Sequence, residues 1–217
     1  MNCECLSHAN VLAACFGLLA YLVGAIPNGF LLARVKGVDI RKVGSGNIGA
    51  TNVFRSVSKT LGILTFIADA VKGLVPALVF PMLAAWISGV NPPAWLGLVY
   101  AALAIVGHTW PIYLGFKGGK GVATSAGALI GLAPLATGIG FVVWILFFVT
   151  SRYVSVASIA AAAAVPAAAW WLYRDNGAAL PVFLTVLGAV IILRHKANIQ
   201  RLATGAEHRF EFKKKRG

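Results

Sequence analysis

Charged side chains are scarce in this sequence, and acidic ones are the scarcest. Charged residues make up 12% of the 217 residues, and Asp and Glu together number 6. Soluble domains carry about 25% charged residues, so the composition excludes an ordinary soluble domain. The few carboxylates form no cluster in the sequence that could hold Mg²⁺. We therefore expect no metal site and no cofactor.

Cysteine is also rare. Cys3, Cys5 and Cys15 lie at or before the first apolar run, and no His or Cys cluster follows them. Nothing in this spacing indicates a zinc site or a disulfide framework. Residues 12–15 look superficially like a lipoprotein cleavage box, but no basic segment and almost no apolar run precede them. We expect the first apolar run to stay as an uncleaved membrane anchor.

Long apolar runs are what the sequence has in abundance. Hydrophobic residues make up 59% of the chain, and the mean hydropathy is +0.82. Uncharged runs of roughly 20 residues, the length that crosses a bilayer as a helix, recur along the chain. The net charge is +13, from 19 Lys and Arg against 6 Asp and Glu. Cytoplasmic loops, anionic lipid headgroups and anionic substrates explain this excess without a nucleic acid.

The runs predict an all-α, polytopic integral membrane protein with a single domain at 1–217. Residues 121–151 are 31 uncharged residues with Pro134 near their middle, which favours a hairpin of two short helices. This gives seven transmembrane helices and places every basic residue except Arg174 on one side or at its edge. The positive-inside rule then puts the N-terminus outside and the C-terminus in the cytoplasm. The predicted spans are about 11–33, 60–86, 94–113, 121–134, 136–151, 153–173 and 178–193.

The first predicted cytoplasmic loop, 34–59, holds a segment of small polar residues. From Gly44 to Arg55, hydroxyl and amide side chains alternate with glycines. Such a segment can donate N–H and O–H groups to phosphate oxygens, with Arg55 as a bidentate clamp. The plainer interpretation is a turn-rich connector with an arginine at the membrane edge.

The second loop, 108–124, contains four glycines and two lysines between Gly115 and Thr124. Glycine lets backbone N–H groups turn toward one point and lysine adds positive charge, so the segment predicts a phosphate cradle. It is not a Walker A motif, because Leu114 replaces a required glycine and Gly121 replaces the Ser or Thr. ATP binding is therefore unsupported. A flexible basic turn is the alternative.

The third polar segment, 194–217, contains His195 and Asn198, which share a face if the last helix continues. His195 could donate to a phosphate or act as an acid or base, although a lone interfacial His is more often structural. Asp69 and Lys72 stand three apart on a predicted membrane helix, where an unpaired charge is unfavourable. They form an intrahelical pair or hold Arg55 or the glycine-lysine loop. Glu207 is expected to be a structural partner.

Three signatures now stand in order along the chain. They are Ser-Gly-Asn-x-Gly-Ala-Thr-Asn-x-x-Arg at 45–55, Gly-His-x-x-Pro with Phe-Lys-Gly-Gly-Lys-Gly-Val-Ala-Thr within 107–124, and His-x-x-Asn-Ile-x-Arg-Leu-x-x-Gly-x-Glu at 195–207. Together they resemble the bacterial acyl-phosphate:glycerol-3-phosphate acyltransferases of the PlsY type. The resemblance implies transfer of a fatty acyl group from acyl-phosphate to the 1-hydroxyl of glycerol 3-phosphate, giving lysophosphatidic acid and inorganic phosphate. It also implies a monomer in the bacterial plasma (inner) membrane, in contact with membrane lipids, with its site on the cytoplasmic face.

The resemblance also assigns roles to residues of this sequence. The expected catalytic residues are Ser45, Arg55, Lys120, His195 and Asn198. The expected substrate-binding residues are Asn47, Thr51, Asn52, His108, Lys117, Gly118, Gly119 and Gly121. Of these, Thr51 and the backbone amides of the last three are expected to cradle the acyl-phosphate headgroup. Which loop holds which phosphate stays open.

No Ser-His-Asp triad and no His-x-x-x-x-Asp acyltransferase motif is present, because Tyr113 and Gln200 stand five positions after His108 and His195. The general base is therefore either the phosphate of glycerol 3-phosphate or His195. Two other classes of protein remain alternatives. One is a transporter of phosphate esters, which the absence of an internal repeat disfavours. The other is a scaffold for anionic lipids, which leaves the three motifs unexplained.

Overall fold

The computed structural model describes residues 3–211, and the side chains from residue 8 onward. The predicted basic segment 213–216 and the side chains of Cys3 and Cys5 lie outside these described parts. Between residues 3 and 211 every regular element is a helix and none is a strand. The all-α prediction is therefore confirmed for this range. The chain forms two compact units, Met1–Leu132 and Ala133–Gly217, and each is described by itself. That the two act as one domain stays a prediction.

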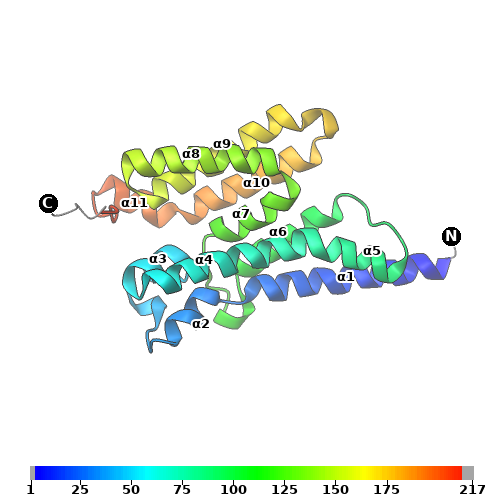
Figure 1. Ribbon diagram of the computed structural model, residues 1–217, viewed down its shortest axis with the longest axis horizontal. Helices are drawn as coiled ribbons and strands as arrows, with labels where there is room; N and C mark the ends of the chain where they lie inside the picture. Colours follow the sequence, from blue (N-terminus) through cyan, green and yellow to red (C-terminus); the bar gives the residue numbers. More distant parts are fainter. Residues whose placement is uncertain (1–2, 212–217) are drawn as a thin grey trace. The chain divides into compact units, whose positions relative to one another are not determined.

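The first unit is built from long apolar helices with short helices at its polar loops (Figure 1). The helix that was predicted at 11–33 breaks before Asn28, because Pro27 supplies no N–H to continue it. The predicted helix at 94–113 ends at Thr109, two residues before Pro111. Its elements are α1 (Cys3–Ala25), α2 (Asn28–Arg34), η1 (Ile40–Lys42), α3 (Ala50–Ser56), α4 (Lys59–Leu74), η2 (Val75–Val79), α5 (Phe80–Ser88), α6 (Leu96–Thr109), η3 (Ile112–Leu114) and α7 (Val122–Leu132).

Close helix packing in the first unit depends on small residues. A side chain at Gly107 of α6 would collide with the backbone of Tyr21 on α1, and one at Gly127 of α7 would collide with Ala70 on α4. Small residues let helix backbones approach closely where the surrounding medium is as apolar as the side chains. The α1–α6 and α4–α7 pairs are consequently tight, and they fix the helix ends that carry the polar loops.

A proline-containing stretch interrupts the second predicted span without ending it. Pro76 cannot donate a helical hydrogen bond, and a π-helical stretch, η2, joins α4 to α5 around it. Lys59–Ser88 remains a continuous apolar run of 30 residues. An aromatic cluster of Phe16, Phe80 and Tyr100 packs α1, α5 and α6 together, with Phe16 and Phe80 ring centroids 5.2 Å apart.

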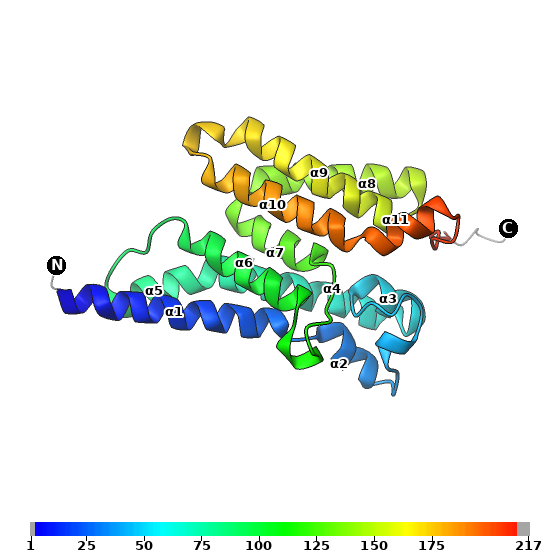
Figure 2. The same cartoon turned by 180° about the vertical axis from the view of Figure 1, so that it is seen from behind.

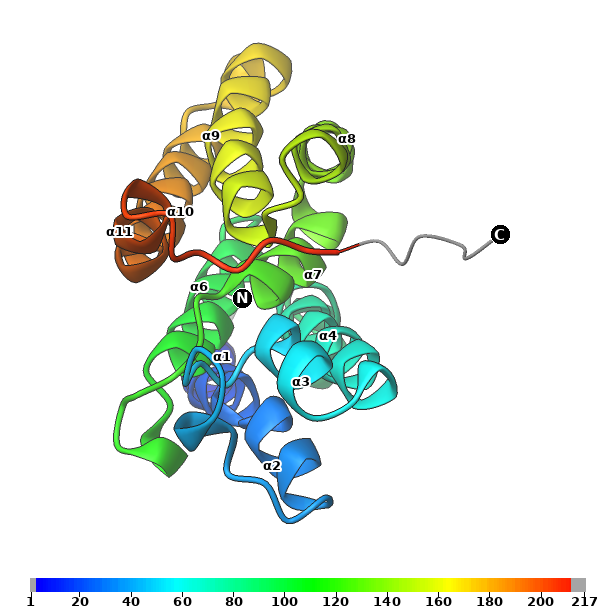
Figure 3. The same cartoon turned by 90° about the vertical axis from the view of Figure 1, so that its left-hand side faces the viewer.

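The second unit is a bundle of three long helices with a short helical end. Figures 2 and 3 show α8 (Pro134–Ser151), α9 (Val154–Leu172) and α10 (Ala179–Arg194) side by side. The Trp144 indole donates to Ser158 Oγ at 3.2 Å, joining α8 to α9. The Trp170 indole donates to Thr185 Oγ1 at 3.1 Å, joining α9 to α10. The short η4 (Arg174–Asn176) lies between α9 and α10, and α11 (Lys196–Ala203) follows α10 after His195.

The number of membrane crossings is only partly settled. Within residues 3–211, five helices are long and apolar enough to cross a membrane, or six if the bent pair α10–α11 is one crossing. As predicted, two helices rather than one occupy 121–151, α7 and α8, separated at Ala133; that they form a hairpin stays a prediction. However, the 11 residues of α7 span only about 17 Å at 1.5 Å per residue, well short of a bilayer core of about 30 Å. Seven crossings and the orientation of the termini stay predictions.

Candidate functional site

Asn52 organises the first polar loop. It is 2% exposed. Its side-chain amide donates to the carbonyl oxygens of Ile40, Val43 and Asn47 at 3.2, 3.1 and 2.9 Å. Its Oδ1 accepts from the Ser45 N–H at 3.1 Å and from Ser56 Oγ at 3.2 Å. The loop thus wraps around one buried amide. Asn52, expected to bind substrate, is used here to hold the loop.

The other predicted residues of this loop lie nearer its surface. Ser45, Thr51 and Arg55 are exposed, and Asn47 is half-buried. Thr51 and Arg55 are four residues apart on α3 and therefore share one face. Asn47 Oδ1 accepts the Gly49 N–H at 2.8 Å, which fixes the turn into α3. The loop consequently presents hydroxyl and guanidinium groups outward from a rigid base.

The glycine-lysine loop is fastened to the end of α6. The N–H groups of Gly118 and Gly119 donate to the carbonyl oxygens of Thr109 and His108, at 3.2 and 3.1 Å. A side chain at Gly119 would meet the His108 imidazole, so only glycine permits this approach. The two glycine amides were expected to point at a phosphate; here they are occupied in holding the loop. Lys117 is exposed and Lys120 is half-buried.

Two buried hydroxyl groups stand at the beginning of α7. Thr124 and Ser125 are almost completely buried. Within residues 3–211, neither Thr124 Oγ1 nor Ser125 Oγ has a hydrogen-bond partner. Buried polar groups are normally satisfied, so an unsatisfied pair needs an explanation. The N-terminus of a helix also favours negative charge. The sequence motif included Thr124, but its spacing gave no sign that Ser125 would be buried beside it.

His108, also predicted to touch substrate, lies inside the first unit. It is 4% exposed, and its Nδ1 is 3.8 Å from Asp69 Oδ1. That separation is too long for a hydrogen bond, but it places the ring beside a carboxylate. The ring therefore faces the helical core and contacts the glycine-lysine loop through Gly119.

The third polar segment begins with a fixed histidine in the second unit. His195 ends α10 and is 3% exposed. Its Nδ1 lies 2.8 Å from the carbonyl oxygen of Ile191. A carbonyl oxygen can only accept, so Nδ1 carries the hydrogen and Nε2 of the neutral ring is an acceptor.

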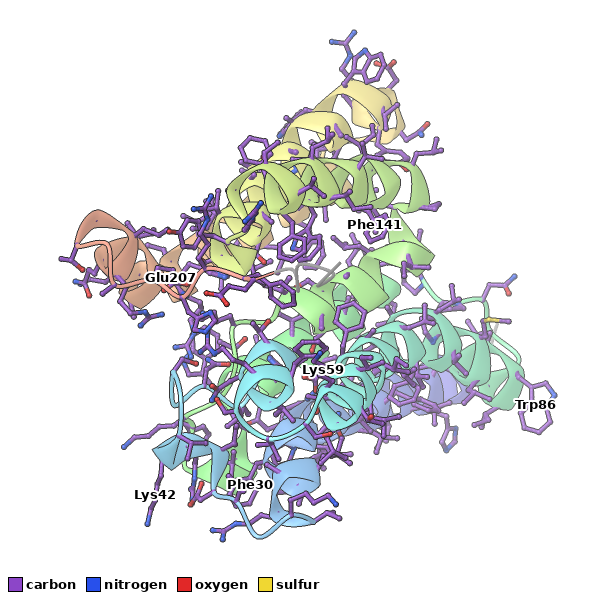
Figure 4. All side chains as sticks on the ribbon, turned by 60° about the vertical axis from the view of Figure 1, so that its left-hand side comes forward. Phe30, Lys42, Lys59, Trp86, Phe141 and Glu207 are labelled. Atoms are coloured by element: carbon purple, nitrogen blue, oxygen red, sulfur yellow. The ribbon has the colours of Figure 1, made fainter. Side chains whose placement is uncertain are left out.

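Glu207 gathers the remaining polar groups of the second unit. Its Oε1 accepts from Ser155 Oγ at 2.8 Å and from Asn198 Nδ2 at 2.6 Å, and its Oε2 accepts from Arg201 Nε at 2.7 Å. Burial acts to raise the pKa of Glu207, but these hydrogen bonds outweigh it, so the pKa lies below its usual value. Figure 4 marks Glu207 on the segment after α11. Sequence reasoning named Glu207 as a structural partner but missed Ser155.

Basic side chains gather at the α2–η1 end of the first unit. The Arg41 side chain holds the pKa of Asp39 well below its usual value, and Arg34 also pairs with this carboxylate. Both guanidinium groups lie over the Phe30 ring, at 5.1 Å for Arg34 and 4.7 Å for Arg41. Figure 4 labels Phe30 and shows Lys42 pointing away from the ribbon. Because the single carboxylate of Asp39 pairs with two arginines, this edge keeps a net positive charge.

These features define an apolar helical protein whose polar loops suit anionic ligands, and known proteins share the pattern. The family model described as glycerol-3-phosphate acyltransferase matches residues 14–205. The glycerol-3-phosphate acyltransferase of Geobacter sulfurreducens is 47% identical over 194 residues, covering 89% of this chain and 95% of the relative. That of Rhodospirillum rubrum is 43% identical over 217 residues, covering 97% and 96%.

Solved structures give the same result. A crystal structure of PlsY, an integral membrane glycerol 3-phosphate acyltransferase, in its glycerol 3-phosphate form has a TM-score of 0.81 and 40% identity to this chain. The match covers 92% of this chain and 96% of that one. The lysophosphatidic acid form has a TM-score of 0.78 and 39% identity, covering 92% and 95%. The chain belongs to the glycerol-3-phosphate acyltransferase family. Membership favours an enzyme of phospholipid synthesis over the transporter and the scaffold.

Proposed function

We propose that this protein transfers a fatty acyl group from acyl-phosphate to the 1-hydroxyl of glycerol 3-phosphate, giving lysophosphatidic acid and inorganic phosphate. The observation that carries the proposal is the first loop, where Ser45, Thr51 and Arg55 are exposed around a base fixed by Asn52. Hydroxyl and guanidinium groups on a rigid loop are suited to phosphate oxygens. Both proposed substrates carry a phosphate.

The chemistry needs little beyond alignment and charge neutralisation. Acyl-phosphate is an activated mixed anhydride. The glycerol 3-phosphate hydroxyl oxygen attacks its carbonyl carbon, a new C–O bond forms, and the bond from that carbon to the phosphate oxygen breaks. The leaving phosphate takes up the negative charge. We assign Arg55 and Lys120 to neutralise phosphate charge as it shifts, and Ser45 and Asn47 to orient the substrates.

We further assign the beginning of α7 to a phosphate. The unsatisfied hydroxyls of Thr124 and Ser125 support this assignment, together with the favourable field of the helix N-terminus. The amides of Gly118 and Gly119 are engaged by α6, so their part is to fix the loop that carries Lys117 and Lys120. This revises the expectation that those two amides bind the phosphate directly.

The hydroxyl proton has two proposed destinations. His195 can accept it at Nε2, because Nδ1 is committed to Ile191. Alternatively, the phosphate of glycerol 3-phosphate takes the proton from its own molecule. His195→Ala should abolish turnover and spare glycerol 3-phosphate binding if His195 is the base. A phosphonate analogue of altered pKa should shift the pH–rate profile if the substrate phosphate is the base. Asn198, held by Glu207, is assigned to orient the acceptor.

We also propose how the protein sits in the cell. The basic edge formed by Arg34, Arg41 and Lys42 favours the cytoplasmic side of a bacterial plasma (inner) membrane. The active site would then face the cytoplasm, where both phosphorylated substrates are soluble or held at the surface. We propose that the protein works as a monomer.

Phosphate release from the purified protein tests the proposal. The protein in lipid is given palmitoyl-phosphate, with and without glycerol 3-phosphate, and with neither metal nor CoA added. Release that requires glycerol 3-phosphate and yields lysophosphatidic acid is the expected result. Release without the acceptor would indicate a phosphatase-like site. No release by folded protein, combined with activity on acyl-CoA, would show that the donor is wrong.

A further inference from the structure

Four polar side chains meet inside the helical core of the first unit. Asp69 and Lys72 come from α4, Asn28 from the start of α2, and His108 from the end of α6. The Lys72 ammonium lies 2.9 Å from Asp69 Oδ1, and the side chains of both residues are at most 5% exposed. Asn28 Nδ2 donates to the same oxygen at 3.0 Å. The pair is therefore more than an intrahelical ion pair.

One arm of this cluster holds the break between α1 and α2. Lys72 Nζ donates to the carbonyl oxygen of Ile26 at 2.7 Å, directly before Pro27. The same carbonyl oxygen accepts the Asn28 N–H at 3.1 Å, so the ammonium and this amide together hold the turn at the break. The neighbouring Gly29 approaches the Ile48 carbonyl so closely that a side chain there would collide with it. Ile48 belongs to the first polar loop, so this arm reaches the segment that carries Ser45 and Asn47.

The other arm reaches the glycine-lysine loop. His108 Nδ1 is 3.8 Å from Asp69 Oδ1. The opposite edge of the ring, Nε2, is the atom that a side chain at Gly119 would meet. The His108 carbonyl oxygen also accepts the Gly119 N–H at 3.1 Å. A shift of the His108 ring would therefore displace the loop that carries Lys120.

We propose that Asp69 is a positioning residue for acyl transfer, which fixes the first polar loop and the glycine-lysine loop relative to each other. Through Asn28 and Lys72 it holds the base of the first loop, and through His108 the base of the second. The buried ion pair has a defined geometry, because losing the Asn28 or the Ile26 contact leaves a polar group unsatisfied in an apolar core. The His108 ring lies beside the same carboxylate at 3.8 Å. The phosphate-binding side chains of both loops then meet the substrates at fixed spacing. This inference rests on the proposed function for its chemistry.

The test uses three variants of the full-length protein. Asp69→Asn keeps the shape and removes the charge, but leaves Lys72 as a buried unpaired cation and can prevent folding. Asp69→Asn with Lys72→Met removes both charges and restores electrical balance. Asp175→Asn is the matched control, because the Asp175 side chain is 93% exposed in the turn after α9. Thermal unfolding in detergent establishes which variants are folded.

Two readouts do not depend on the acyl donor. Calorimetry measures the dissociation constant for glycerol 3-phosphate, and hydrogen exchange measures the opening of the Gly118 and Gly119 amides relative to those within α6. In the folded double variant we expect the dissociation constant to rise about tenfold, equivalent to about 1.4 kcal/mol. The two loop amides should exchange faster while the α6 interior keeps its protection. The control should match the wild type in both.

Three results would overturn the proposal. The first is a folded double variant with unchanged binding and unchanged loop exchange. The second is faster exchange spread evenly over α6 and the loop, which indicates a purely structural pair. The third is failure of both Asp69 variants to fold, which makes the cluster a folding element only. Wild-type turnover with palmitoyl-phosphate is measured in parallel. If the wild type lacks it, the proposed donor fails, while binding and exchange still decide the role of Asp69.

Discussion

Replacing Asn52 tests whether the first loop depends on one buried amide. In Asn52→Asp the carboxylate keeps the size of the side chain and one acceptor, but an oxygen replaces the amide nitrogen. That oxygen then faces the carbonyl oxygens of Ile40, Val43 and Asn47, to which the amide nitrogen of the wild type donates at 2.9–3.2 Å. The two N–H groups that these three carbonyls share are lost and the new oxygen repels all three, so the loop must open or the acid must take up a proton.

The size of the effect follows from these contacts. A hydrogen bond contributes about 1 kcal/mol net, so losing the two N–H donors costs about 2 kcal/mol of loop stability. At 1.4 kcal/mol per factor of ten, kcat/KM should fall by about thirtyfold if the ordered loop is the active form. Asn52→Ala should be milder than Asn52→Asp, because water can enter the vacated space and solvate the carbonyls without repulsion.

The assay is phosphate release at varied glycerol 3-phosphate, with unfolding followed on the same samples. Asn91→Asp is the matched control, since Asn91 is exposed in the turn between α5 and α6. It should leave kcat/KM unchanged. Asn52→Asp with wild-type kcat/KM and stability, or with milder effects than Asn52→Ala, would refute the idea that the amide holds the loop.

Three further predictions concern single positions. Gly119→Ala places a methyl group against the His108 ring and should lower kcat/KM at least about tenfold; Gly138→Ala, a helical glycine with open space around it, should leave activity unchanged and raise thermal stability slightly. Arg55→Lys keeps the charge but loses the planar fork, so KM should rise in steady-state assays; an unchanged KM would exclude a bidentate role. Because the pKa of Glu207 is lowered in the folded protein, its ionised carboxylate stabilises the fold. This contribution to stability is fully present above the ordinary carboxyl pKa and is lost as the pH falls through the lowered pKa. Melting temperatures should therefore decline below about pH 4, and less so in Glu207→Gln; identical profiles would contradict this.

The apolar runs predicted most helix positions because hydrophobic length is a direct requirement of the bilayer. The helices at 60–86, 153–173 and 178–193 correspond to Lys59–Ser88, Val154–Leu172 and Ala179–Arg194. Helix ends were less predictable where proline intervened. Pro27 falls inside the predicted span 11–33, yet it divides α1 from α2, since a lost N–H does not reveal whether a helix bends or stops.

The sequence predicted which residues belong to the polar loops, but not which of them hold the loop backbone in place. Sequence pattern identifies Asn52, Gly118 and Gly119 as parts of polar loops, and it cannot distinguish a group that faces a ligand from one that faces its own backbone. In the structure all three face the backbone. Small amide residues and glycines serve both purposes, because each offers short-range donors and little bulk.

The buried cluster shows why spacing alone understated Asp69. Lys72 follows it three positions later, and that spacing suffices to explain a pair on one helix. Its other partners, Asn28 and His108, are 41 and 39 positions away and come from helices whose packing the sequence does not disclose. In the headgroup region, water can satisfy the remaining donors and acceptors of an ion pair within one helix. In an apolar core, polar groups on neighbouring helices must satisfy them instead. A charged pair inside a long apolar run therefore predicts at least one polar residue on a neighbouring helix. Here Asn28 begins α2, the helix before the first polar loop, and His108 lies near the end of α6, to which the glycine-lysine loop is bonded. A buried carboxylate can therefore position the residues of both loops without contacting the substrates itself.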